Sequence, residues 1–375
     1  MKITRIRAIP VQPRWLFVKL ETDEGLSGWG EALGDKAHVV AEAVRSHEHY
    51  LVGQDPRRIV HHWQSMYRGA FWRGGPVLCG AIGGLEAAMW DVLGQSLGVP
   101  VYQLLGGAVR ERIRVYTHVR GRTPQALADS ARELVAAGYT ALKFCPLGKT
   151  HVVDHYQVVE EAAARVQAVR EAVGSGVDVM LDFHGLVSPA MAVWLEEAIR
   201  PFHPLFIEEP VLPENVEALA QVAPQFKTPI ATGERLVTRW GFREVLEKGA
   251  ARVLQADPSV CGGIFETRQI GAMAETYYAA LAPHNSSGPL NLAACLHMDA
   301  CTPNFLVQEF IGGRALGEGG YLKEPFVVKD GTIDLPTKAG LGIEVDEAFL
   351  ESVPLGPQED VGRWFHDDDG SVADW

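Results

Sequence analysis

The sequence predicts an α/β protein in which a (β/α)8 barrel follows an N-terminal α+β domain. Eight short apolar runs rich in β-branched residues recur between residues 115 and 310, with amphipathic helical segments between them. Strands that alternate with helices form parallel sheets, and eight such units close into a barrel. Before residue 115 the pattern differs, because strand-like alternation comes first and helical segments follow it.

The first hundred residues predict the α+β domain. About twenty residues alternate in the manner of strands, and FVKLETDEGLSGWGE indicates a hairpin with its turn at Asp23-Glu24-Gly25. Apolar residues then recur at helical spacing in residues 36–52, 56–70 and 80–105. The pair Gly106-Gly107 predicts the end of the last of these helices.

The barrel strands are predicted from the apolar runs that follow. These runs are residues 115–119, 141–144, 177–185, 204–210, 229–234, 252–259, 279–284 and 304–310. Beyond about residue 320 the chain returns to short strand-like pieces, and we expect it to pack against the first domain. The expected organisation is therefore an N-terminal domain over 1–113, a barrel over 114–320 and a C-terminal segment over 321–375.

Composition and charge exclude several classes of protein. The 375 residues are 47% hydrophobic and 22% charged, which is typical of a globular protein and not of a disordered one. With 47 acidic against 34 basic side chains, the net charge of −13 disfavours nucleic acid as a partner. We find no uninterrupted apolar stretch of the roughly 18 residues that a membrane span needs, so no membrane association is expected.

Cysteine usage predicts a cytoplasmic protein. The five cysteines are odd in number and lack CxxC spacing, which fits neither a disulfide framework nor a structural zinc site. At the start of the chain, Arg5, Arg7, Pro10 and Pro13 interrupt any apolar stretch that could serve as a signal sequence.

A series of polar residues marks the ends of six predicted strands. The series is Asp182, Glu208, Glu234, Asp257, His284 and Glu309, separated in turn by 26, 26, 23, 27 and 25 residues. One βα unit separates each residue from the next. The carboxyl ends of barrel strands converge on one mouth, so we expect all six side chains to meet there.

The first three members of the series indicate a metal site. Asp182, Glu208 and Glu234 are carboxylates on consecutive strands, and three converging negative charges repel one another unless a cation lies between them. Oxygen-only ligands favour Mg²⁺. Any one of these carboxylates alone would be interpreted more simply as a solvated loop charge or a helix cap.

Two histidines are candidates for proton transfer. Asp257 and His284 end neighbouring strands, where the carboxylate can orient the imidazole as a general base. His184 lies two residues after Asp182, so along a strand both side chains face the same side. It is a candidate second acid or base, although a histidine that braces a metal ligand would lie there as well.

At these residues the chain resembles the enolase superfamily, in particular the mandelate racemase subgroup and its D-galactonate dehydratase-like acid-sugar dehydratases. The similarity extends over RWLFVKLETDEGLSGWGE, YRGAFWRGGP, AAMWDVLGQSLGVPVYQLLGG, LDFHG, PLFIEEP, GERL, LAPH, LAACLHMD and SVADW. It implies a modified (β/α)8, TIM-like barrel under an N-terminal α+β capping domain that the C-terminal segment completes. It also implies Mg²⁺-assisted removal of the proton α to a carboxylate.

The resemblance assigns roles to individual residues. It implies one Mg²⁺ per subunit on Asp182, Glu208 and Glu234, a base dyad of His284 and Asp257, His184 as the second catalytic histidine, and Glu309 as a hydrogen-bonding partner of a substrate carboxylate oxygen. Arg14, Tyr67 and Arg73 lie in segments that resemble the loops over the mouth, and with Lys143 they are the candidates for substrate binding. Trp29, Trp72 and Trp90 are interpreted as core or domain-interface packing.

The second strand departs from the family pattern. Racemases and cycloisomerases carry a Lys-x-Lys pair there, whereas this chain has Lys143-Phe144-Cys145. Without the second lysine, a symmetric two-base racemase is disfavoured. Galactonate dehydratases carry asparagine in place of Cys145, so the resemblance does not identify the substrate.

These observations predict an enzyme that dehydrates an acid sugar, a small aldonate, to its 2-keto-3-deoxy acid. A proton α to a carboxylate is very weakly acidic, so its removal needs a divalent cation near the growing negative charge. His284 would take the proton at C2, and His184 would protonate the departing 3-hydroxyl. An epimerase acting on the same enediolate and a non-catalytic protein with an inherited barrel remain alternatives. By resemblance the protein is a homo-oligomer, an octamer.

Overall fold

A three-stranded antiparallel sheet forms the N-terminal domain of the computed structural model, which describes residues 1–311, 320–353 and 364–374. Its strands are β1 (Ile3–Val11), β2 (Trp15–Thr22) and β3 (Ser27–Ala32), paired in that order. The predicted hairpin is confirmed: the N–H of Thr22 donates to the carbonyl of Leu26 (3.0 Å), and Gly25 occupies the left-handed region at φ 81°.

Five helices complete this part of the chain: α1 (Ala37–Ser46), α2 (Glu48–Leu51), α3 (Ile59–Gly69), α4 (Gly75–Leu97) and α5 (Val101–Leu104). The predicted end of the last helix at Gly106-Gly107 is wrong. Helix α4 ends at Leu97 because Gly98 adopts the left-handed conformation (φ 69°), and α5 begins only after Pro100. Helix α4 is long and apolar enough to cross a membrane, but 83% of its most apolar window is buried inside the protein.

Close packing of α4 on the sheet explains two glycines of β3. A Cβ at Gly28 would lie 2.1 Å from the carbonyl oxygen of Ala88, and one at Gly30 would lie 2.2 Å from that of Gly84. Only glycine permits this approach.

Eight parallel strands form the barrel, and all eight predicted runs are confirmed. They are β4 (Arg112–His118), β5 (Ala141–Phe144), β6 (Asp178–Asp182), β7 (Ile207–Glu208), β8 (Ile230–Thr232), β9 (Val253–Leu254), β10 (Ala280–Leu281) and β11 (Gln308–Glu309). Neighbours in the chain pair with one another, and β11 pairs with β4. The N–H of Leu281 donates to Asn304 and its carbonyl accepts from Leu306, which closes the ring between β10 and β11.

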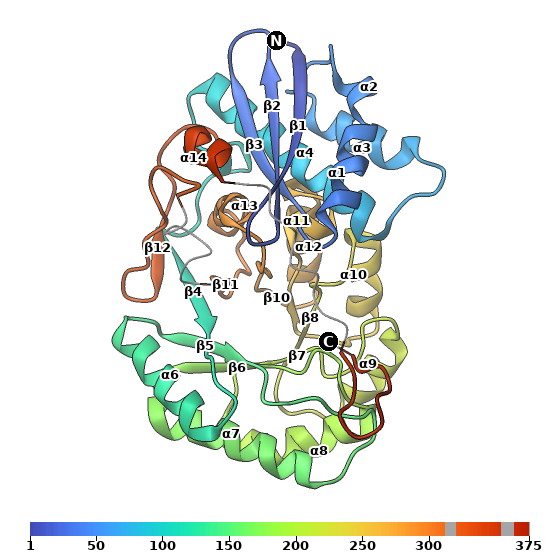
Figure 1. Ribbon diagram of the computed structural model, residues 1–375, viewed down its shortest axis with the longest axis vertical. Coiled ribbons are helices and arrows are strands. Elements are labelled where there is room, and N and C mark those ends of the chain that lie inside the picture. Colours follow the sequence, from blue (N-terminus) through green and yellow to red (C-terminus); the bar gives the residue numbers. More distant parts are fainter. Residues whose placement is uncertain (312–319, 354–363, 375) are drawn as a thin grey trace.

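One buried side chain in, or directly next to, each strand belongs to a single apolar cluster inside the barrel. This inner cluster consists of Tyr116, Ala141, Met180, Phe206, Ala231, Val253, Ala282 and Val307. Helices cover the outside of the ring, and Figure 1 shows the N-terminal domain above it. These helices are α6 (Pro124–Ala136), α7 (Gln157–Val173), α8 (Pro189–Ile199), the 3-10 helix η1 (Arg200–Phe202), α9 (Val216–Val222), α10 (Thr238–Glu247), α12 (Ile264–Thr276) and α13 (Pro289–Ala300). The short helix α11 (Pro258–Cys261) instead packs against α4 and β3 of the N-terminal domain.

The C-terminal segment contacts both parts of the molecule. It contains β12 (Thr332–Asp334), which pairs with β4, and α14 (Glu347–Ser352). Tyr321 packs on Phe17 with ring centroids 5.4 Å apart, and Glu347 pairs with Lys19 of β2 at 2.7 Å. Asp367 instead pairs with Lys149 of the barrel at 2.8 Å. The boundaries after residues 113 and 320 stay predictions, and residues 354–363 and 375 of the segment lie outside the described residues.

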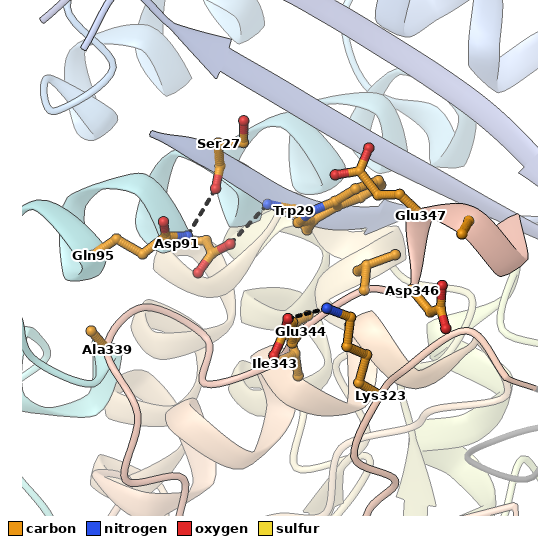
Figure 2. A pocket seen from close by; sticks show the side chains of 12 residues that line it. Ser27, Trp29, Asp91, Gln95, Lys323, Ala339, Ile343, Glu344, Asp346 and Glu347 are labelled. Carbon is orange, nitrogen blue, oxygen red and sulfur yellow. Dashed lines mark hydrogen bonds and ion pairs between the residues drawn. The ribbon is translucent and has the colours of Figure 1, made fainter. Parts of the chain in front are cut away.

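A cleft of about 450 Å³ lies where the C-terminal segment meets β3 and α4 (Figure 2). Its wall includes Trp29, whose backbone N–H donates to Asp91 Oδ2 (2.9 Å), and the ion pair between Lys323 and Glu344. The carboxylates of the strand-end series do not line it, so this cleft is separate from the predicted site.

The three tryptophans predicted to pack have different environments. Trp29 and Trp90 are buried, as expected, but the prediction for Trp72 is wrong because its side chain is 85% exposed. Trp72 lies in the irregular stretch between α3 and α4, where no helix face directs it toward the core.

A buried histidine in α13 predicts a pH-dependent stability. Burial lowers the pKa of His297 to about 4, whereas in the unfolded chain it is near 6.5. The unfolded state therefore takes up a proton first as the pH falls, and the native state loses about 2 kcal/mol between pH 7 and pH 5. We expect His297→Gln to lose correspondingly less stability over this interval, as measured by urea unfolding. Equal pH dependence of both proteins would contradict this.

Candidate active site

Three carboxylates converge at the mouth of the barrel. Asp182 and Glu208 are the last residues of β6 and β7, and Glu234 follows β8 by two residues. One oxygen atom from each lies within 4.8 Å of the others, and Asp182 and Glu208 are buried. The structure thus brings together the three residues that the strand spacing predicts as metal ligands.

A buried lysine lies beneath these carboxylates. Lys143 Nζ donates to Glu208 Oε2 (2.7 Å) and lies 3.1 Å from Glu309 Oε1 and 3.4 Å from Asp182 Oδ2. Burial lowers the pKa of Lys143, but the surrounding carboxylates outweigh burial and hold it well above its usual value. The lysine therefore carries a positive charge. Its predicted role in substrate binding stays a prediction, because its observed partners are carboxylates of the protein.

One lysine does not neutralise the group. Burial, and after it the negative charge of the neighbouring Asp182, raise the pKa of Glu208 to about 8. Moreover, Glu208 Oε1 is buried and accepts no hydrogen bond from any residue that the structure describes. A buried oxygen without a partner is costly, and a cation would satisfy it. The donor set and this oxygen therefore fit a divalent metal ion.

Replacement of Lys143 tests this charge balance. Removing one partner from a buried charged group typically costs about 3–5 kcal/mol. We therefore expect Lys143→Met to lower the melting temperature of the metal-free protein, and added Mg²⁺ to raise it more than in the unmodified protein. Calorimetry with a chelator and with Mg²⁺ measures both effects.

Lys149→Met is the matched control, since the ion pair of Lys149 with Asp367 is exposed and such pairs contribute little. A loss of stability no larger than in this control would disprove the compensating role of Lys143.

His284 lies on one side of the carboxylate group. Its Nδ1 donates to Asp257 Oδ2 (2.8 Å), and its Nε2 lies 3.1 Å from Glu234 Oε2. Asp257 Oδ1 accepts from Ser259 Oγ (2.7 Å) and Asn291 Nδ2 (2.9 Å), which fixes the carboxylate. The predicted dyad is therefore formed, and Nε2 is the nitrogen that faces the mouth.

His184 contacts another of the three carboxylates Asp182, Glu208 and Glu234, which we call the triad. Its Nε2 lies 3.1 Å from Asp182 Oδ2, and its backbone N–H donates to Asp182 Oδ1 (3.0 Å). The expected contact is present, but the strand alternation that predicted it is wrong. Strand β6 ends at Asp182, and His184 adopts a left-handed conformation at φ 51° in the following turn.

Both imidazoles respond to the carboxylates around them. Burial lowers the pKa of each ring, but Asp182 raises that of His184 to about 11, and Glu309 and Glu234 raise that of His284 to about 10. These values apply to carboxylates that hold no cation. A divalent ion on the triad would reduce their negative charge and lower the pKa of both rings.

Glu309 is held by partners within the protein. Its Oε1 accepts from His118 Nε2 (2.6 Å) and its Oε2 from the N–H of Asn285 (2.8 Å). Burial raises the pKa of Glu309, but Lys143 and His284 outweigh it and hold the pKa well below its usual range. An ionised Glu309 accepts hydrogen bonds only, so its contact with a substrate carboxylate oxygen stays a prediction.

The predicted substrate-binding residues of the capping loops lie in the N-terminal domain. Arg14 is half-buried in the turn between β1 and β2. Tyr67 of α3 stacks with Trp63 and with Trp240, with ring centroids 5.0 and 5.5 Å away, and Arg73 lies over its ring. Their contacts described here are packing contacts, and their role in binding stays a prediction.

Sequence reasoning missed several residues that support the site. His118 is the last residue of β4, so the strand-end rule that selected the other six residues could have found it. Ser259, Asn285 and Asn291 gave no signal, because their positions depend on loops and on α13 and not on strand spacing.

The three carboxylates offer oxygen ligands suited to a divalent cation, and two of them, Asp182 and Glu234, each contact a histidine. This arrangement defines the class of protein as a metal-assisted acid–base enzyme. Comparison with known proteins gives the family. Residues 8–106 match the model described as the N-terminal domain of mandelate racemase / muconate lactonizing enzyme, and residues 126–349 match the model described as enolase C-terminal domain-like. The chain therefore belongs to the mandelate racemase / muconate lactonizing enzyme family of the enolase superfamily.

Individual relatives are similar over the whole chain. A D-galactonate dehydratase of Ralstonia nicotianae is 46% identical, and one of Pectobacterium atrosepticum is 43% identical, each alignment covering 100% of both proteins. The crystal structure of a mandelate racemase/muconate lactonizing enzyme from Sulfitobacter sp. has a TM-score of 0.90 and 37% identity. That match covers 95% of this chain and 96% of the other.

Proposed function

We propose that the protein is a Mg²⁺-dependent hydro-lyase that converts an acid sugar of the galactonate type to the 2-keto-3-deoxy acid. One observation carries the proposal: His184 and His284 contact different members of the triad, Asp182 and Glu234, with Glu208 on the strand between them. Relatives named D-galactonate dehydratase, 42–46% identical over their full length, support the same activity and substrate class.

Asp182, Glu208 and Glu234 would hold one Mg²⁺ per subunit, because oxygen-only donors suit a hard cation. When bound, the ion supplies positive charge that stabilises the negative charge developing on the substrate carboxylate.

His284 is the proposed base at C2. Asp257 accepts a hydrogen bond from the Nδ1–H of His284, which leaves the lone pair of Nε2 directed to the mouth. Nε2 takes the C2 proton, and the electron pair of the broken C–H bond forms the C1–C2 double bond of an enediolate. Asp257 keeps the ring in this orientation and stabilises its positive charge after the transfer.

His184 is the proposed acid at C3. Its Nε2 contacts Asp182, on the side of the triad opposite to the contact of His284 with Glu234. The proton of His184 moves to the 3-hydroxyl oxygen as the C3–O bond breaks and water leaves. The enediolate electrons then form the C2–C3 double bond, and the resulting enol tautomerises to the 2-keto-3-deoxy acid.

Epimerisation is the second candidate, since a proton returned to C2 from His184 would invert the centre without loss of water. The second strand disfavours it, because the lysine position of the two-base racemases holds Cys145 in this chain. The thiol of Cys145 lies beside His184 and also favours its protonated form.

Incubation with a panel of aldonates and aldarates in the presence of Mg²⁺ tests the proposal. We expect a 2-keto acid from galactonate or a close stereoisomer. A new epimer without a 2-keto acid would establish the epimerase instead, and no change in any substrate would indicate a non-catalytic protein.

The proposal includes the setting in which the enzyme works. Five free cysteines among the described residues are consistent with a cytoplasmic location. The octameric assembly implied by resemblance would be measured by light scattering on the purified protein.

A further inference from the structure

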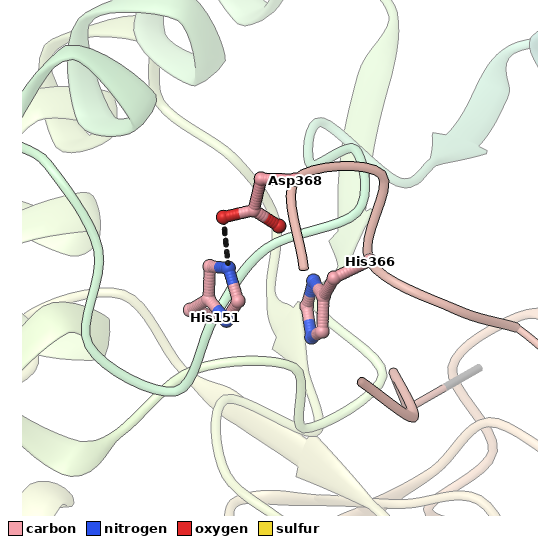
Figure 3. A group of neighbouring side chains, drawn as sticks. All are labelled: His151, His366 and Asp368. Carbon is pink, nitrogen blue, oxygen red and sulfur yellow. Dashed lines mark hydrogen bonds and ion pairs between the residues drawn. The ribbon is translucent and has the colours of Figure 1, made fainter. Parts of the chain in front are cut away.

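A second group of metal-binding side chains lies away from the carboxylate triad. It consists of His151, in the loop between β5 and α7, and of His366 and Asp368 in the C-terminal segment (Figure 3). One donor atom from each lies within 4.8 Å of the others. Residues more than two hundred positions apart in the chain therefore meet in one cluster.

Contacts within the cluster are close. His151 Nε2 lies 3.2 Å from Asp368 Oδ2, and the rings of His151 and His366 stack with centroids 3.8 Å apart and an interplanar angle of 16°. Two imidazoles at this distance repel each other when both are protonated, whereas neutral imidazole is the form that binds metal ions.

The charge around the cluster favours a cation. Asp367, Asp368 and Asp369 are consecutive in the chain, and Lys149 pairs with Asp367 at 2.8 Å. The pair neutralises one carboxylate, so the negative charge of Asp368 and Asp369 remains beside the two imidazoles.

We propose that His151, His366 and Asp368 form a second metal site, specific for a first-row transition-metal ion such as Zn²⁺. Two imidazole nitrogens and one carboxylate oxygen are a common Zn²⁺ donor set, whereas Mg²⁺ prefers oxygen ligands only. His151 and His366 are half-buried and Asp368 is exposed, which leaves further coordination positions to water. This site is independent of the proposed dehydratase activity.

A metal ion here would fasten the C-terminal segment to the barrel. The loop that carries His151 begins after β5, the strand of Lys143, and the carbonyl of Val152 accepts from the N–H of Ser188 in the next loop of the barrel mouth (2.8 Å). Binding would thus link residues 364–374 to two loops of the mouth.

Calorimetric titration of the full-length protein with Zn²⁺, in saturating Mg²⁺, tests the site. The variants are His151→Ala and His366→Ala, with His155→Ala as the matched control, because His155 is an exposed histidine of the same loop. Glu208→Gln removes one ligand of the triad, so a loss of Zn²⁺ binding in this variant would show that the Zn²⁺ binds at the triad and not at the cluster.

We expect a first group, the unmodified protein with His155→Ala and Glu208→Gln, to bind one Zn²⁺ at this site. In His151→Ala and His366→Ala the affinity for this Zn²⁺ should fall by about tenfold or more. Zn²⁺ should also raise the melting temperature in the first group only. Equal Zn²⁺ binding by all five proteins, or loss in Glu208→Gln alone, would overturn the proposal and leave the cluster a packing contact.

Discussion

Replacing any one residue of the triad, by Asp182→Asn, Glu208→Gln or Glu234→Gln, is expected to weaken Mg²⁺ binding and lower turnover by about 10²-fold or more. Each change removes one negative oxygen ligand from a hard-cation site but keeps the shape of the side chain. The fold should survive, because the eight-strand ring and its apolar interior do not depend on these groups.

Glu208→Gln should show the largest loss of Mg²⁺ affinity of the three. Its Oε1 has no partner among the described residues, whereas Asp182 and Glu234 also contact histidines. Titration calorimetry with Mg²⁺ and a 2-keto acid assay measure affinity and turnover.

Glu209→Gln is the matched control for the triad variants. Glu209 follows Glu208 directly and is as buried, but it pairs with Arg235. We expect it to retain Mg²⁺ affinity. Unchanged Mg²⁺ affinity in all three triad variants would disprove the assignment of the metal site.

Strand spacing predicted the triad because the carboxyl ends of adjacent parallel strands meet whatever the length of each strand. Strand β7 is only two residues long, yet Glu208 still stands at its end beside Asp182. The same rule applies to His118, the polar residue that ends β4.

Positions beyond a strand end could not be derived in this way. His184 meets Asp182 through a left-handed turn, which alternation along a strand does not describe. Helix α4 ends at Leu97, and Gly98 follows it eight residues before Gly106, the first glycine of the pair that predicted its end. Glycine stands at both positions, so glycine alone does not identify the end of the helix. Pro100, two residues after Gly98, is the additional stop signal that the glycine pair lacks, and it precedes α5 directly.

Nothing in the sequence indicates that His151, His366 and Asp368 form a cluster. Asp367–Asp369 would be solvated as an isolated acidic run, and His151 and His366 are separated by most of the barrel. Only the path of the C-terminal segment brings them together.

The two histidines of the site should have separable effects on substrate, because removal of the C2 proton and departure of the 3-hydroxyl are different proton transfers. If His284 is the base, His284→Asn abolishes both dehydration and the exchange of the C2 proton with deuterium from D₂O. General acid–base catalysis by a positioned side chain is typically worth about 10²–10⁴-fold, so the loss should be large.

His184→Asn should have a different signature. Dehydration falls by a similar factor, since hydroxide is a poor leaving group without an acid beside it, but the dyad of His284 and Asp257 stays intact. Part of the C2 exchange should therefore remain. NMR of substrate recovered from D₂O with Mg²⁺ measures exchange, and the 2-keto acid assay measures dehydration of the same samples.

His155→Asn controls for the loss of a histidine outside the site, because this side chain is exposed on the β5–α7 loop. Substantial C2 exchange by His284→Asn together with none by His184→Asn would reverse the two roles. Undiminished dehydration by either site variant would refute the mechanism, because elimination from a weakly acidic carbon needs a base at C2 and an acid at C3, and each histidine is proposed to supply one of them.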